Sequence, residues 1–155
     1  MERKFEFVSR MNGIPKGIGN LPKRSTTKSA GYDFINPKAV TIMPSEIKLV
    51  KTGVKAYFPQ DEMLVLCNRS SNPIKKGLIL INGVGIIDSD YVDNLDNEGE
   101  IAFAFMNISK EPVTIKVGEK LGQGIFVKYG LTDNDSAKGE RKGGFGSTDN
   151  PKNRI

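Results

Sequence analysis

One carboxylate stands where a β-strand could hold it rigidly. Asp88 directly follows an apolar run in the segment Asn82-Gly-Val-Gly-Ile-Ile-Asp-Ser-Asp-Tyr91. A carboxylate in that setting is positioned and partly desolvated, which suits a base that orients water. In the same segment, Asn82 could read the edge of a nucleobase, because it has both a donor and an acceptor, and Tyr91 could pack against a sugar. An acidic hairpin turn is the alternative interpretation, but it explains only the last residues of the segment.

The chain contains no histidine, and this excludes more chemistry than any other feature. Histidine general bases, Ser-His-Asp and Cys-His nucleophiles and His-ligated zinc are all excluded. The net charge is +5, from 23 basic and 18 acidic residues, and it favours an anionic partner. Because the basic residues are spread along the chain, a small polyphosphate and a nucleic acid both fit this charge.

Two segments carry side chains that could hold phosphate. Asn68-Arg-Ser-Ser71 combines two hydroxyls, a guanidinium and backbone amides at the end of an expected strand. The alternative is a turn in which a serine caps a short helix beginning at Pro73. Arg141-Lys-Gly-Gly-Phe-Gly-Ser-Thr148 combines glycines and donors with Phe145, a flat ring that could stack on a base. A frayed basic tail is the alternative there.

Two single side chains are further candidates. Asp33 lies in Ser29-Ala-Gly-Tyr-Asp-Phe34, a β segment in which Gly31 indicates a close approach of the backbone. Its carboxylate could support Mg²⁺, which prefers oxygen ligands and keeps its waters, although a surface aspartate at a strand end is the alternative. Gln123 follows what the pattern predicts to be a turn leading into a strand, and it could bind phosphate.

Short apolar runs separated by Gly, Pro, Asn or Asp predict strands nearly throughout. We expect strands around residues 4–8, 54–58, 63–67, 78–81, 101–106, 113–117 and 125–127, and one helical turn at Asn72–Lys76. Many short strands with glycine-rich turns predict an all-β sandwich or barrel. Residues 130–155 carry few apolar side chains, so we expect a flexible C-terminal arm after a β domain of residues 1–129.

Cysteine content and hydropathy bear on the compartment. The single cysteine, Cys67, excludes an internal disulfide framework and is typical of a reducing cytosol. No stretch approaches the roughly 20 apolar residues of a membrane span, and the first ten residues lack the apolar core of a signal peptide. We therefore expect a cytoplasmic protein.

Together the segments resemble, in order, the five motifs of the trimeric dUTP pyrophosphatases (dUTPases). The matching residues are 29–34, 69–71, 85–91, 121–123 and 143–148, and Asn82–Tyr91 is similar to the bacterial and phage branch. The resemblance implies a jelly-roll-like β-fold and a homotrimer with active sites shared between subunits. It also implies hydrolysis of dUTP to dUMP and pyrophosphate, with Mg²⁺ as the cofactor.

The resemblance implies a role for each matching residue. Asp88 would orient the water that attacks the α-phosphorus, and Tyr91 would stack on the deoxyribose and exclude a ribose. Asn82 and the backbone near Ile86 and Ile87 would read uracil. The other implied ligands are Arg69, Ser70, Ser71 and Gln123 on phosphates, Arg141, Ser147 and Thr148 around the γ-phosphate, Phe145 with Gly146 over the base, and Asp33 on Mg²⁺ through water.

The chain departs from the family pattern in four places. An acidic insertion, Asp93–Glu98, follows the third motif, and we expect it to lie away from the chemistry. Arg141 lies one residue closer to the Gly-Gly pair than the family's arginine, which leaves its γ-phosphate role open. Gly122 replaces an alanine and Asp149 replaces a glycine.

Three other functions compete with dUTP hydrolysis. The dCTP deaminases share the fold, but the position of their catalytic glutamate aligns with Ala104, and the arginine of their second motif is replaced by lysines at 75 and 76. A regulatory protein that binds a protein partner would use the Asp93–Glu98 insertion. A nucleic-acid binder is favoured only by the charge, and we expect no stable nucleic-acid partner.

Overall fold

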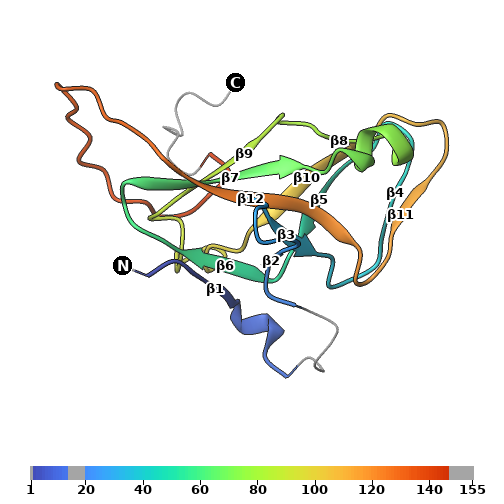
Figure 1. Cartoon of the computed structure of the whole chain (residues 1–155), viewed down its shortest axis with the longest axis horizontal. Helices are drawn as coiled ribbons and strands as arrows, with labels where there is room; N and C mark the ends of the chain where they lie inside the picture. Colours follow the sequence, from blue (N-terminus) through green and yellow to red (C-terminus); the bar gives the residue numbers. More distant parts are fainter. Residues whose placement is uncertain (1, 14–19, 147–155) are drawn as a thin grey trace.

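The computed structural model describes residues 2–13 and 20–146. Its strands and short helical turns, labelled in Figure 1, are β1 Lys4–Phe7, η1 Ser9–Met11, β2 Lys23–Arg24, β3 Tyr32–Ile35, β4 Val40–Ile42, β5 Ile47–Lys51, β6 Val54–Tyr57, β7 Glu62–Asn68, η2 Asn72–Lys76, β8 Leu78–Leu80, β9 Gly85–Asp88, β10 Ala102–Asn107, β11 Val113–Ile115 and β12 Lys120–Lys128. The expected strands and the helical turn expected at Asn72–Lys76 are confirmed, whereas the short turn η1 was not predicted. Beyond β12, the described chain runs to Gly146 without a further strand.

The described strands pair antiparallel in four sheets. The largest has the order β2-β3-β12-β7-β9, and a three-stranded sheet has the order β5-β10-β8. The pairs β1-β6 and β11-β4 complete the set. Figure 1 shows η2 near the β4–β11 end of the molecule and the chain after β12 extending at the other end.

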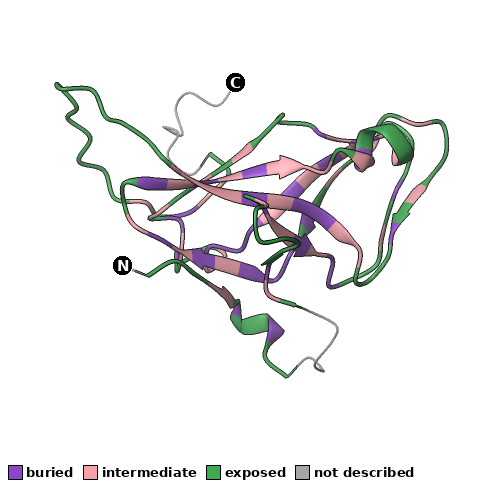
Figure 2. Ribbon diagram, in the orientation of Figure 1, coloured by how far each residue is buried: buried purple, intermediate pink, exposed green. Residues whose placement is uncertain are grey.

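The core lies between the inner faces of the two larger sheets. Phe34 of β3 and Phe103 of β10 are almost fully buried, and their ring centroids lie 5.5 Å apart. Along β7, Leu64 and Leu66 point into this core, because alternate residues of a strand face opposite sides. Figure 2 shows this alternation as bands of buried residues along the strands.

Gly122 and Gly124 lie inside the long strand β12. A Cβ on Gly122 would lie 2.3 Å from Cε1 of Phe103, and a Cβ on Gly124 would lie 2.9 Å from side-chain atoms of Leu64 and Phe34. The expected turn leading into a strand is confirmed, because a turn at residues 117–118 precedes β12, and β12 begins at Lys120, earlier than the strand expected at 125–127. Gly122 and Gly124 make room for core side chains. The same crowding explains why this chain accommodates glycine before Gln123.

No helix in residues 2–13 or 20–146 is long and apolar enough to span a membrane.

Candidate active site

Asp88 is the last residue of β9, which lies at the edge of the five-stranded sheet and pairs with β7. Beside it lies a cavity of about 250 Å³. The cavity is lined by Leu66, Asn82, Gly85, Ile86, Ile87, Asp88, Tyr91, Ala102, Arg141, Gly144 and Phe145. The structure thus brings together seven of the predicted site residues, drawn from the hairpin and from the chain after β12.

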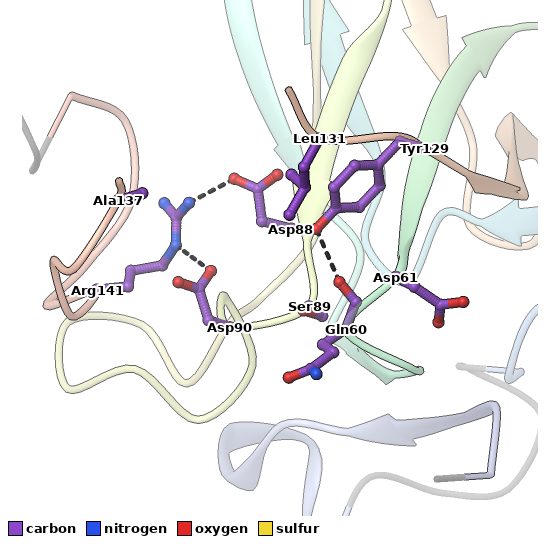
Figure 3. Close-up of a pocket in the computed structure, with 9 residues that line it drawn as sticks. All are labelled: Gln60, Asp61, Asp88, Ser89, Asp90, Tyr129, Leu131, Ala137 and Arg141. Atoms are coloured by element: carbon purple, nitrogen blue, oxygen red, sulfur yellow. Dashed lines mark hydrogen bonds and ion pairs between the residues drawn. The ribbon is translucent and has the colours of Figure 1, made fainter. Parts of the chain in front are cut away.

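Arg141 reaches the Asp88 carboxylate, as Figure 3 shows. Its Nη2 donates to Oδ2 of Asp88, and its Nε donates to Oδ1 of Asp90 at 2.6 Å. Burial acts to lower the pKa of Arg141, but the hydrogen bond to Asp90 and the charges of both carboxylates outweigh it and raise that pKa. Arg141 is therefore a fixed cation beside a carboxylate that is 52% exposed. In this structure its side chain also donates from Nη1 to the Gly143 carbonyl at 3.4 Å.

A larger cavity, of about 860 Å³, adjoins the other side of this ion pair. Figure 3 shows its wall, in which Tyr129 and Leu131 face the Asp88–Arg141 pair from the chain that follows β12. Tyr129 Oη donates to the Gln60 carbonyl at 2.7 Å and so ties that chain to the turn before β7. The Asp88 carboxylate is accessible from this side as well.

Tyr91 is the most buried polar ring of the pocket, at 6% exposure. Its Oη donates to the Glu100 carbonyl at 3.1 Å and accepts from Asn97 Nδ2 at 2.8 Å. The Asp93–Glu98 insertion was expected to lie away from the chemistry; in the structure one of its side chains, Asn97, contacts a residue of the pocket. The sequence analysis missed Asn97, because no local pattern indicates that an amide in an acidic loop contacts a side chain six residues earlier.

The segment 69–71 connects β7 to η2 at the other end of the sheet. Ser71 occupies the N-cap position of η2, yet its side chain makes no capping hydrogen bond, so the capping alternative is wrong. Asn72, which is 2% exposed, instead donates to Oδ1 of Asn68 at 2.8 Å and to the Leu121 carbonyl at 2.8 Å. This buried amide, which the sequence analysis overlooked, shapes the loop that carries the two serine hydroxyls.

Asp33 and Gln123 are direct neighbours across β3 and β12. A Cβ on Gly31 would lie 2.1 Å from Oε1 of Gln123, so the expected close approach at Gly31 is confirmed. Asp33 Oδ2 accepts from Lys120 Nζ and Ser25 Oγ, both at 2.6 Å. Burial acts to raise the pKa of Asp33, but these two hydrogen bonds outweigh it and lower that pKa. Lys120 and Ser25 were not among the predicted site residues.

The two groups of side chains lie along one face of the five-stranded sheet. Asp88 pairs with Met63 and Gln123 pairs with Cys67, four residues further along β7. At about 3.3 Å per residue this separation is about 13 Å, and the 69–71 loop lies still further away. One chain therefore presents the Asp88 carboxylate and its pocket at one end of the sheet, and Asp33, Gln123 and the 69–71 loop at the other.

Phe145 and Gly146 are the last predicted site residues within the described chain, and both are exposed. Phe145 is 73% exposed and has a φ of 49°, at the rim of the 250 Å³ cavity. Ser147 and Thr148 lie outside the described residues. Their role at the γ-phosphate stays a prediction.

The fold and the pocket place the chain among antiparallel all-β proteins with a pocket beside an edge strand. The chain belongs to the dUTPase family, whose family model matches residues 19–149. It is 49% identical over 148 residues to the deoxyuridine 5′-triphosphate nucleotidohydrolase of Lactococcus lactis, covering 94% of this chain and 97% of that protein. The corresponding protein of Rickettsia felis is 36% identical over 84% of this chain and 88% of its own length.

Solved structures agree with this assignment. The crystal structure of dUTPase from Streptococcus mutans superposes with a TM-score of 0.78 at 43% identity, covering 84% of this chain and 98% of that chain. The dUTPase from phage phi11 of S. aureus, at 19% identity, shares the fold with a TM-score of 0.71, covering 90% of this chain and 97% of that chain. The fold is thus the jelly-roll β-fold that the sequence predicted.

Proposed function

We propose that the chain hydrolyses dUTP to dUMP and pyrophosphate, with Asp88 orienting the attacking water. The single observation that carries this proposal is the half-exposed Asp88 carboxylate in the wall of the 250 Å³ pocket. Arg141 uses Oδ2 of Asp88, so Oδ1 can accept a hydrogen bond from water. As the water oxygen bonds to the α-phosphorus, one water proton passes to the Asp88 carboxylate, the bond to the bridging oxygen breaks, and pyrophosphate leaves with the electron pair. A base within hydrogen-bond reach of the water is sufficient for this step.

The pocket supports recognition of a deoxyuridine. Asn82 and the edge strand at Ile86 and Ile87 line one side of it, and the buried Tyr91 ring lines another. In the proposed complex, the amide and the backbone groups pair with the uracil edge. Tyr91 packs against the deoxyribose and leaves no room for a 2′-hydroxyl, and Phe145 covers the base.

The donors at the other end of the sheet suit a triphosphate with Mg²⁺. Mg²⁺ is commonly held by one or two carboxylates together with substrate phosphates. Among the described residues no group of three or more acidic or cysteine side chains could cage a metal, while the single carboxylate Asp33 lies beside Gln123. This donor set fits an ion carried by the triphosphate and contacted by Asp33 through water. When bound, the ion neutralises phosphate charge, while Arg69, Ser70, Ser71 and Gln123 hold the phosphate oxygens.

We further propose that the chain forms a homotrimer whose copies share each site. The separation of about 13 Å along β7 places the phosphate donors of one chain too far from its own Asp88 to hold adjacent phosphates. A second copy can supply them, because the outer face of the β5-β10-β8 sheet is apolar and open. This face comprises Ile47, Leu49, Ile79, Ile81, Ala104 and Met106.

The position of that face connects it to the pocket. Ile47 and Leu49 are 57% and 42% exposed, which is costly for large apolar side chains that gather on one surface. Ala102 continues the face along β10 and lines the 250 Å³ cavity. A copy packed there would therefore border the nucleotide. Ala104 lies on the same face. It aligns with the catalytic glutamate of the dCTP deaminases, and this chain therefore has no carboxylate at that position.

A protein partner in addition to this homotrimer stays a prediction. Within the insertion, Asp93 and Glu98 are engaged by Lys55, Tyr57 and Ser9 of the same chain. Leu95, at 96% exposure, is the part of the loop that a partner could contact.

Pyrophosphate release with dUTP, dCTP, dTTP and UTP side by side tests the proposed activity. A mismatched base would leave the Asn82 amide unpaired, at a cost of about 1–3 kcal/mol, and other pocket contacts would add to it. We expect dUTP to be hydrolysed at least about 100-fold more efficiently than dCTP. Comparable kcat/KM values for the two nucleotides would contradict the proposal.

A further inference from the structure

We propose that the insertion 93–98 positions Tyr91 through Asn97, and that this contact strengthens discrimination against ribonucleotides. The inference rests on the proposed role of Tyr91 at the sugar. Asn97 is then a positioning residue, because it contacts the phenol and not the nucleotide.

The geometry of the insertion brings its two ends together. The Asp93 amide donates to the Glu98 carbonyl at 3.0 Å, and this bond closes the loop. Gly99 follows with a φ of 77°, and a Cβ there would lie 2.6 Å from the Tyr91 carbonyl oxygen and from Cα of Val92. The glycine therefore lies against the backbone of Tyr91 and Val92, although six residues intervene in the sequence.

The closed loop is anchored on its outer side. Asp93 accepts from Lys55 Nζ at 2.5 Å and from Tyr57 Oη at 2.7 Å, both on β6. Glu98 accepts from the Ser9 amide at 3.0 Å and from the Ser9 hydroxyl. Four contacts to two separate elements hold the loop as a rigid support.

The inner side of the loop contacts Tyr91. Asn94, which is 8% exposed, donates to the Tyr91 carbonyl at 2.8 Å and to Oδ1 of Asn97 at 2.8 Å. The Gly99 amide also donates to Oδ1 of Asn97, at 3.0 Å. With its oxygen fixed by two donors, the Asn97 amide is oriented so that its nitrogen donates to the Tyr91 hydroxyl at 2.8 Å.

The Tyr91 ring also packs against Gly144. A Cβ on Gly144 would lie 2.6 Å from Cε2 of Tyr91, so the chain after β12 lies directly against the ring edge. A ring held at its hydroxyl by Asn97 and Glu100 cannot tilt away from the sugar. Without the Asn97 donor, we infer, the ring yields enough to admit a 2′-hydroxyl more often.

A double-mutant cycle on the full-length protein tests the inference. The measured quantity is the dUTP preference, defined as kcat/KM for dUTP divided by kcat/KM for UTP. Removing one hydrogen bond predicts that Asn97→Ala lowers this preference by about 3- to 10-fold, with kcat for dUTP within about 2-fold of wild type. In a Tyr91→Phe background, which lacks the hydroxyl, Asn97→Ala should change the preference by less than about 2-fold.

Leu95→Ala is the matched control, since it truncates the exposed tip of the same loop, and it should leave the preference unchanged. If Asn97→Ala fails to fold, Tyr91→Phe alone tests the contact from the other side and should lower the preference by at least as much. An unchanged preference in Asn97→Ala, an equal fall in the Tyr91→Phe background or an equal fall in Leu95→Ala would each overturn the inference. Tyr91→Ala distinguishes a failure of this inference from a failure of the proposed function. If Tyr91→Ala leaves the preference intact, the proposed role of Tyr91 at the sugar fails.

Discussion

The two ends of the five-stranded sheet are built in different ways. At the end proposed to bind phosphate, called the phosphate end (Asp33, Gln123 and residues 69–71), the side chains lie on or beside interior strands, next to buried amides such as Asn72, at 2% exposure. At the pocket end, Asp88 and Phe145 are 52% and 73% exposed and lie on an edge strand and on the chain after β12. The phosphate end is thus fixed by the core of the sheet. The pocket end is fixed by contacts between segments distant in sequence, and these contacts can be altered one at a time.

The largest expected effect concerns the carboxylate at the pocket end. Asp88→Asn keeps the shape of the side chain but weakens its ability to orient water, so we expect kcat to fall by about 10²-fold or more with nucleotide affinity changed only a few-fold. Asp61→Asn is the control, because Asp61 lines the neighbouring cavity but not the nucleotide pocket. Steady-state pyrophosphate release and binding of a non-hydrolysable analogue measure both quantities. Wild-type turnover in Asp88→Asn would exclude the assigned role.

A second experiment asks whether the two ends that act together belong to different copies. Asp88→Asn and Arg69→Ala each damage one end, so a mixed oligomer should contain some sites with both ends intact. After co-refolding equal amounts, random assembly predicts activity in about a quarter of the sites. Mixing Asp88→Asn with Tyr91→Ala is the control, because both changes damage the pocket end. A site contained in one chain would show no recovery in either mixture.

The smallest expected effect concerns acid stability at the phosphate end. The pKa of Asp33 is lowered in the folded protein relative to its ordinary value of 3.8, because Lys120 and Ser25 outweigh the effect of burial. The stabilisation is therefore fully present above that value and is lost as the pH falls through the lower, folded pKa. Relative to Asp33→Asn, the wild-type advantage in unfolding free energy should stay constant from pH 7 to about 5 and shrink below about 4.

Urea unfolding at fixed protein concentration and stepped pH measures this difference. Asp96→Asn is the control, since Asp96 is exposed in the insertion. An advantage that persists unchanged at the lowest pH would show that the contact of Asp33 with Lys120 contributes no pH-dependent stability.

Much of the fold was predictable because strands have a pattern of apolar residues that is visible in a short stretch of sequence. The alternation around β6 and the apolar runs of β7 and β10 require no knowledge of distant residues. The reason for a glycine at 122 could not be predicted from the sequence, because the ring that it makes room for, Phe103, is brought against it only by the fold. Local patterns describe what a residue permits but not what packs on it.

The candidate site divides in the same way. Asp88, Asn82 and Tyr91 share one short segment, so their common pocket could be predicted from spacing. The partner of Asp88, Arg141, lies 53 residues away, and no local pattern indicates that contact. Asn97 was missed for a related reason, because its function depends on a loop whose ends meet only in three dimensions.

The closed loop at 93–98 separates the length of a segment from the geometry that it supports. Because its two ends are joined by the Asp93–Glu98 backbone bond, residues added at the tip need not move Tyr91. Doubling the length of a flexible loop costs only about 0.6 kcal/mol in closure entropy. Leu95 is therefore a suitable insertion site, where an epitope or a small reporter peptide could be added to the enzyme while the pocket keeps its shape.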